Sequence, residues 1–205
     1  MLVLLFLSLY NLPAPKRQAN YEHLNIGHIG TGTTLLPHDI IAAQLPGADH
    51  VLEPLIKPNN FGGYDPILCE NYTRNNKTLF IKLRPQIAFS NGIPIKSTHI
   101  QQSIAYFSSQ KIHPYIRKLC ESLTLTIHSP KMISLSSSLD IDILKLLSDI
   151  PIIYDPTLPI GSGPYLLSDQ NTDQVTYTLN PNYWGEPPSK NNFNTLTYHF
   201  HKSTF

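Results

Sequence analysis

Two histidines near the end of the chain have a spacing that can hold a metal ion. His199 and His201 stand two residues apart in the alternating segment FNTLTYHFHKS, and a period of two places both imidazoles on one face of a strand. Zinc and copper accept imidazole ligands, but such sites need a further ligand at a matched spacing. No such ligand accompanies this pair, and His23 and His28 are equally isolated. We therefore interpret them as solvent-facing strand residues and predict no metal site.

The other groups capable of catalysis or phosphate binding lack the partners that those chemistries need. Asp140 and Asp142 stand where a helix is expected to begin, and carboxylates there complement the helix dipole. Ser162 is followed by Gly-Pro, and the proline prevents the strand-to-helix elbow that exposes a nucleophilic serine. Residues 30–32 (GTG) lack the lysine of a phosphate loop. The sequence thus argues against an enzyme and against nucleotide binding, and it indicates no cofactor.

Cys69 and Cys120 are the only cysteines. Neither belongs to a C-x-x-C pair of the kind found in zinc and redox sites. We interpret them as buried free thiols. A disulfide between them is the alternative, because sequence alone does not place two Cα atoms within bonding range.

The charge balance excludes some partners, and the N-terminus indicates a destination. Net charge is +1 and charged residues make up 14% of the chain, without a Lys/Arg cluster of the kind that binds nucleic acid. Residues 2–10 are almost purely apolar, too short to span a bilayer but long enough for a signal-peptide core. We interpret residues 1–19 as a possible signal peptide, atypical because no basic residue precedes the apolar run, and expect a periplasmic protein. A buried first strand or helix is the alternative.

Hydrophobic periodicity predicts the elements that position these residues. Apolar residues alternate in residues 79–83 and again in 87–89, followed by a turn signal at Ser90-Asn91-Gly92. Further strands are predicted at 24–29, 123–135 (a hairpin turning at 129–131), 175–179 and 193–200.

Two helices are predicted between these strands. One begins with Ser97 or Thr98 as its cap, and the other spans residues 140–150 with Ile143, Leu144 and Leu147 inward. Asp49 is expected to cap a shorter helical turn. This mixture of strands and helices predicts an α/β or α+β fold.

Tyr183 and Trp184 stand in LNPNYWGEPP, beside proline and glycine. Such a pair is typical of a packed corner that fixes a loop onto a sheet. A stacking platform for a ligand is the alternative.

Three segments, in order and at fitting distances, resemble the extracellular solute-binding proteins of family 5, which bind oligopeptides, dipeptides or nickel for ABC importers. They are KTLFIKLRPQIAFSNGIPIKSTHIQQSI, IGSGPYLLSDQ and LNPNYWGEPP, preceded by the similar stretch VLEPLIKPNNFGGYDPILCENY. The resemblance covers roughly residues 35–203 and corresponds to the N-terminal half of such proteins only. Residues 95–99 depart from the family pattern because they lack its acidic residues.

The resemblance implies an α/β, periplasmic-binding-protein-like (type II) fold that is incomplete, with a mixed sheet and an inserted smaller lobe. Residues 20–45 and 156–205 would form part of the main ligand-binding lobe, residues 46–155 the inserted lobe, and the second ligand-binding lobe would be absent. The structural motif that marks the return into the main lobe comprises Gly161, Gly163, Pro164 and Tyr165, with Tyr183 and Trp184 holding the following loop.

The resemblance also implies a function without catalysis. The family holds an extended peptide largely through backbone hydrogen bonds, and the corresponding ligand-facing residues are Ala42, Ala43 and Gln44. The implied partners are a peptide or other small solute, an ABC importer permease and a second chain supplying the missing lobe. The alternative is a truncated, non-functional or scaffold fragment that binds nothing by itself. A transcription regulator would need a helix-turn-helix segment, which we do not find.

Overall fold

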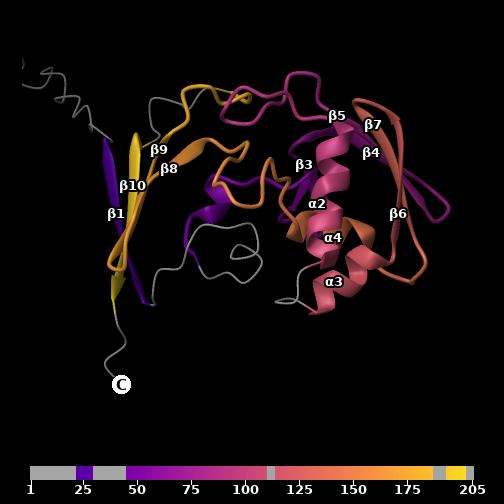
Figure 1. The fold of residues 1–205 in the computed structure, drawn as a ribbon, viewed down its shortest axis with the longest axis horizontal. Coiled ribbons are helices and arrows are strands. Elements are labelled where there is room, and N and C mark those ends of the chain that lie inside the picture. The colour runs from indigo at the N-terminus through magenta and orange to yellow at the C-terminus, as the bar shows by residue number, and fades with distance from the viewer. Residues whose placement is uncertain (1–21, 30–44, 110–113, 187–192, 202–205) are drawn as a thin grey trace, which may run out of the picture.

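The computed structural model describes residues 22–29, 45–109, 114–186 and 193–201. Within these residues the strands form two four-stranded sheets and one two-stranded sheet. Figure 1 shows the first four-stranded sheet at one end of the molecule and the second at the other end, beside the helices α2, α3 and α4. The segments that join the two ends contain the candidate functional site.

The first sheet combines strands from both ends of the described chain. Its order is β1-β10-β9-β8, and the strands are β1 (His23–Ile29), β8 (Tyr165–Gln170), β9 (Gln174–Leu179) and β10 (Thr195–His201). β1 pairs with β10 in parallel, while β9 pairs antiparallel with both of its neighbours. The sheet is therefore mixed, as expected. The predicted strands 24–29, 175–179 and 193–200 correspond to β1, β9 and β10, respectively.

The buried face of the first sheet is covered by the segment around a short 3-10 helix, η1 (Ala48–His50). Val175, Tyr177 and Leu196 are at most 5% exposed and contribute to one hydrophobic core. The same core includes Leu45, Ala48, Val51 and Leu52. Residues 45–52 thus pack with the first sheet and not with the second.

The second sheet has the order β4-β5-β7-β6 and is antiparallel throughout. Its strands are β4 (Cys69–Asn75), β5 (Thr78–Leu83), β6 (Leu123–Ser129) and β7 (Met132–Ser137). The alternation predicted in residues 79–83 is confirmed, because Leu79, Ile81 and Leu83 are each 1% exposed. The predicted hairpin is confirmed as β6 and β7. Ile87 and Phe89 are buried but lie outside the named strands, with only an isolated bridge between Ala88 and Pro94.

Three α-helices pack with the second sheet around the larger core: α2 (Ser97–Ser109), α3 (Pro114–Glu121) and α4 (Ile143–Asp149). α2 buries Ile100, Ile104 and Phe107, one face at the 3.6-residue period that the sequence predicted. The prediction that Ser97 or Thr98 caps this helix was wrong, because both residues lie inside α2, and the Ser97 hydroxyl donates instead to the carbonyl of Ser129 at 2.7 Å. The sequence prediction missed α3.

α4 is shorter than predicted because its cap is Asp142. That carboxylate accepts a hydrogen bond from the backbone N–H of Leu144 at 3.0 Å, which satisfies one free donor of the first turn. The buried residues of α4 are Ile143, Leu146 and Leu147, whereas Leu144 is half-buried.

The remaining strands form a short hairpin, β2 (Ile56–Pro58) and β3 (Tyr64–Pro66), which the sequence prediction missed. The prediction for Asp49 was wrong. Gly47 occupies the cap position of η1, and Asp49 lies inside the turn without a side-chain capping bond. Across the residues that the structure describes, no helix is both long enough and apolar enough to cross a membrane.

Candidate functional site

The candidate site is built around Glu53, which lies between the segment covering the first sheet and the hairpin β2–β3. This side chain is 4% exposed, although glutamate is almost never fully buried unless it is paired. Its sequence context is VLEPLI, in which the apolar residues on both sides of Glu53 are buried. The backbone therefore carries the carboxylate inward.

Three side chains donate hydrogen bonds to this carboxylate. Ser162 Oγ and Trp184 Nε1 reach Oε2 at 3.0 and 3.1 Å, and the Tyr183 hydroxyl reaches Oε1 at 3.1 Å. Trp184 Nε1 also donates to the carbonyl of Ser162 at 3.0 Å. Three segments that are distant in sequence are thus joined at one buried carboxylate. We call this group of four residues, Glu53, Ser162, Tyr183 and Trp184, the Glu53 junction.

The Glu53 junction contains no ion pair. Within the described part of the chain no basic side chain lies within ion-pair distance of Glu53, and Lys57 acts on it only from longer range. Burial raises the pKa of Glu53 above its ordinary value, while the hydrogen bonds from Trp184, Ser162 and Tyr183 act in the opposite direction. The pKa of Tyr183 is also raised, first by burial and then by the nearby Glu53 charge.

Two glycines bring the backbone of the Glu53 junction into close contact with the segment before Glu53. A Cβ atom added to Gly161 would lie 1.9 Å from the carbonyl oxygen of Val51, and one added to Gly163 would lie 2.1 Å from that of His50. The backbone N–H of Gly163 donates to the Val51 carbonyl at 2.9 Å. Any side chain at either position would force these two segments apart.

Asn180 ties the same turn to the end of β9. Its side-chain amide donates to the Gly163 carbonyl at 2.9 Å, and its backbone N–H donates to the carbonyl of Pro164 at 2.8 Å. Tyr165 follows as the first residue of β8, is 8% exposed and donates through its hydroxyl to the Phe193 carbonyl at 2.8 Å. Gly161, Gly163, Pro164 and Tyr165 therefore lie together at the entrance to the first sheet.

Tyr183 and Trp184 form a packed corner in this structure. Their ring centroids are 5.4 Å apart and the rings are tilted by 54°. The Tyr183 hydroxyl and Trp184 Nε1 both donate to Glu53. Trp184 is only half-buried, because one side of its ring borders an open pocket.

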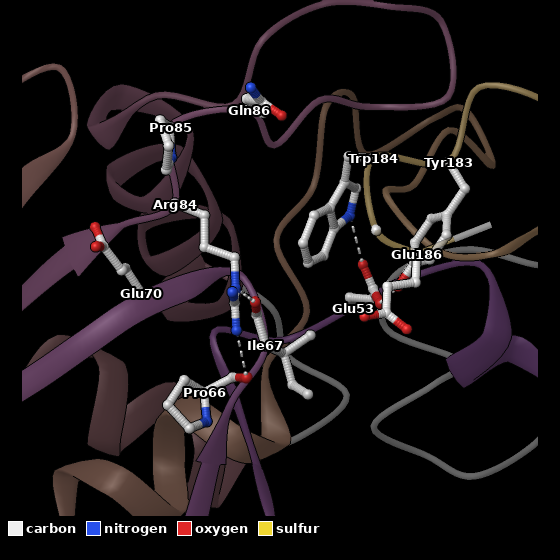
Figure 2. Close-up of a pocket in the computed structure, with 11 residues that line it drawn as sticks. Glu53, Pro66, Ile67, Glu70, Arg84, Pro85, Gln86, Tyr183, Trp184 and Glu186 are labelled. Atoms are coloured by element: carbon white, nitrogen blue, oxygen red, sulfur yellow. Dashed lines mark hydrogen bonds between the residues drawn. The ribbon is translucent and has the colours of Figure 1, made fainter.

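This pocket has a volume of about 730 Å³, which falls within the range of small-molecule sites. Figure 2 shows Arg84 on one side of it and Trp184, Tyr183, Glu53 and Glu186 on the other. The remaining lining residues are Pro66, Ile67, Glu70, Pro85, Gln86 and Gly185. We call this space the Arg84–Trp184 pocket.

Among the other candidate residues, neither His199 nor His201 lines this pocket. Ala42, Ala43 and Gln44 lie outside the described residues. His199 is half-buried on β10 with Nε2 3.1 Å from Asn25 Oδ1, and His201 is exposed. No group of three or more His, Cys, Asp or Glu side chains within the described residues is arranged to hold a metal ion.

Both cysteines are buried and free, as the favoured sequence interpretation predicted. Cys69 and Cys120 lie in the core around the second sheet. Burial raises the pKa of the Cys69 thiol to about 11 and that of Cys120 to about 12.

Sequence analysis missed Glu53, Arg84 and Asn180 as members of the site. A signal for Glu53 was present, because a single carboxylate within an otherwise apolar run needs buried partners. Arg84 carried no comparable signal. Its contacts depend on how the second sheet is positioned next to residues 183–186.

The fold is that of the binding proteins of ABC importers. An ABC transporter substrate-binding protein from Sinorhizobium meliloti superposes with a TM-score of 0.72 at 17% identity, over 87% of this chain and 39% of that one. NikA from Staphylococcus aureus, in complex with Ni(L-His)2, gives a TM-score of 0.72 at 20% identity, over 88% of this chain and 39% of that one. A mannohexaose-bound periplasmic oligopeptide-binding protein from Thermotoga maritima gives a TM-score of 0.73 at 17% identity, over 87% of this chain and 38% of that one. At these identities the likeness establishes the fold alone, and the chain spans about 39% of the length of such proteins.

The family follows from the sequence itself. A profile of the bacterial extracellular solute-binding proteins, family 5 Middle, matches residues 63–204, which is more than half of the 205-residue chain. The chain belongs to this family, and the resemblance identified from the sequence is confirmed. A search of curated proteins found no match.

Proposed function

We propose that this chain captures short peptides as the solute-binding component of an ABC importer, without catalysis. The observation that carries the proposal is the family match over residues 63–204. The likeness in fold to an oligopeptide-binding protein adds support. The bound peptide would then be delivered to the importer's permease.

The peptide is held through its backbone in this proposal. An extended ligand paired along a strand edge gains its affinity from main-chain hydrogen bonds, so its side chains can vary. The residues assigned to that edge are Ala42, Ala43 and Gln44, which belong to the segment between β1 and η1.

The main ligand-binding lobe would comprise the first sheet with the segment that covers it, and the inserted lobe would comprise the second sheet with its helices. Residues 45–52 pack in the core of the first sheet. This supports a boundary near Glu53 instead of the boundary at residue 46 expected from the sequence. The return boundary near residue 156 is kept, because the Gly161–Gly163 turn leads directly into β8.

Residues 1–19 would act as a signal peptide and direct the protein to the periplasm. A second ligand-binding lobe, supplied by further polypeptide, would complete the enclosure of the peptide, because enclosure between two lobes excludes water and makes binding tight. The alternative is a scaffold that binds no peptide by itself.

Calorimetric titration of the chain with trialanine tests the proposal. We expect a saturable heat of binding. Successive N–H groups of a strand point to opposite sides, so one of the variants Ala42→Pro and Ala43→Pro removes a donor facing the ligand and weakens binding.

The matched controls Ala42→Ser and Ala43→Ser keep the backbone N–H and are expected to bind as the unmodified chain does. Absence of heat with every peptide tried would instead support the scaffold.

A further inference from the structure

The Arg84–Trp184 pocket is lined by charged residues that play no part in the proposed peptide contacts, and these charges define the ligand that it can take. It lies beside the Glu53 junction, where the second sheet approaches residues 183–186. Three carboxylates and one guanidinium line it. Which of these charges already have partners determines what remains for a ligand.

Arg84 supplies an uncompensated positive charge. Its Nε donates to the Ile67 carbonyl at 2.7 Å and Nη2 donates to that of Pro66 at 3.3 Å. These bonds to two neutral carbonyls fix the guanidinium in place, with its central carbon 5.8 Å from the centre of the Trp184 ring. No carboxylate forms an ion pair with Arg84 in the described ranges. Since a guanidinium carries five N–H donors, some remain for an anionic ligand group.

Glu186 is the carboxylate of this pocket that has no ion-pair partner among the described residues. The carboxylate of Glu53 is already satisfied by three donors, and Glu70 is paired with Lys82 at 2.8 Å. Glu186 is exposed, and no basic side chain within the described part of the chain forms an ion pair with it. One cationic and one anionic group therefore remain, and Figure 2 shows them on opposite sides of the pocket.

Apolar side chains also line the pocket. Trp184 and Pro85 both border it, and each offers an apolar surface to an aliphatic side chain. A ligand that fits must carry a carboxylate, an ammonium group and a compact apolar group.

We propose that the Arg84–Trp184 pocket binds a free α-amino acid with an aliphatic side chain. Its carboxylate binds Arg84, its ammonium group binds Glu186, and its side chain packs against Trp184 and Pro85. This second site is independent of the peptide-binding proposal. If the chain binds an amino acid but no peptide, the pocket proposal holds and the peptide-binding proposal fails. If it binds a peptide but no amino acid, the reverse is true.

Emission from Trp184 reports on the pocket, because this is the only tryptophan in the chain. The full chain is titrated with L-leucine, with 4-methylpentanoate, which lacks the ammonium group, and with 3-methylbutylamine, which lacks the carboxylate. We expect a saturable change with leucine. Each analogue should bind at least about tenfold more weakly, because charge-assisted hydrogen bonds in a partly enclosed site contribute that much or more.

Glu186→Gln is expected to weaken leucine binding about tenfold and to leave 4-methylpentanoate binding unchanged. Glu186→Asp should restore much of the leucine affinity. Glu70→Gln is the matched control, because Glu70 lines the same pocket but is already paired with Lys82. It should bind leucine as the unmodified chain does.

Two results would overturn the proposal. The first is the absence of a saturable leucine effect in both Trp184 emission and the NMR signal of its indole N–H. The second is unchanged leucine affinity in Glu186→Gln, with circular dichroism confirming that the variant is folded.

Discussion

Glu53 makes the stability of the folded chain depend on pH. Burial raises its pKa above the ordinary value of 4.5, so the folded state holds the proton more tightly than the unfolded state does. The tighter proton binding by Glu53 therefore stabilises the folded state fully below pH 4.5, and this stabilisation is lost as the pH rises through the raised pKa.

In Glu53→Gln the titrating group is gone. We expect the free energy of unfolding of the unmodified chain, minus that of this variant, to fall as the pH rises from about 4 to about 8. Urea unfolding at several pH values measures this difference. Glu70→Gln should show no such trend, because Glu70 is exposed and lies outside the Glu53 junction. A difference that stays flat or rises with pH would contradict the interpretation of Glu53.

Gly163 is predicted to be intolerant of any side chain. Gly163→Ala places a Cβ atom 2.1 Å from the His50 carbonyl oxygen, a backbone atom that cannot simply rotate away. We expect a loss of about 1–3 kcal/mol in the free energy of unfolding, the usual range for overpacking a well-packed site.

Gly27→Ala is the control for Gly163→Ala, since its nearest neighbour would be a side-chain atom at 3.6 Å. Thermal unfolding followed by circular dichroism compares the two variants. Equal melting temperatures would show that the close approach at Gly163 does not constrain the fold.

The two thiols are predicted to be unreactive while the chain is folded. Their raised pKa values of about 11 and about 12 leave almost no thiolate at pH 8, and both side chains are at most 2% exposed. Mass spectrometry after iodoacetamide treatment should detect no labelling of Cys69 or Cys120 in buffer and labelling of both in urea. Rapid labelling of either cysteine in the folded chain would be inconsistent with the core described above.

At the scale of elements, Asp142 is expected to determine where α4 begins. Asp142→Ala removes the acceptor for the Leu144 N–H and should lower the free energy of unfolding by about 1 kcal/mol. Asp140→Ala is a matched control two residues earlier, outside the helix, and should lower the free energy of unfolding much less. Chemical denaturation of both variants distinguishes a cap from a general charge effect, which would make the two losses equal.

The sequence predicted elements best where one face is buried and the other exposed. β5 and α2 have clear periods because their apolar residues face a core. β4 had no such period, since only Cys69 in it is buried, and an edge strand with two solvated faces carries little alternation. α3 was missed because it is short and the sequence around Pro114 was interpreted as a link. The hairpin β2–β3 has only three residues in each strand.

At the scale of the whole molecule, the two sheets are joined by contacts between residues distant in sequence. Glu53 and Trp184 are separated by 131 positions, and no local pattern specifies such a contact. The motifs containing Gly161 and Trp184 were identified from family resemblance, but their common partner Glu53 was not. The pocket could not be predicted either, because Arg84 and Glu186 come together only once both sheets are in place.

Peptide capture by main-chain pairing is the central claim, and hydrogen–deuterium exchange of the full chain with and without trialanine tests it most directly. We expect slower amide exchange on peptide addition in the proteolytic fragment that contains Ala42, Ala43 and Gln44, because a paired strand edge withdraws its N–H groups from solvent. Unchanged exchange in that fragment at a saturating trialanine concentration would contradict it.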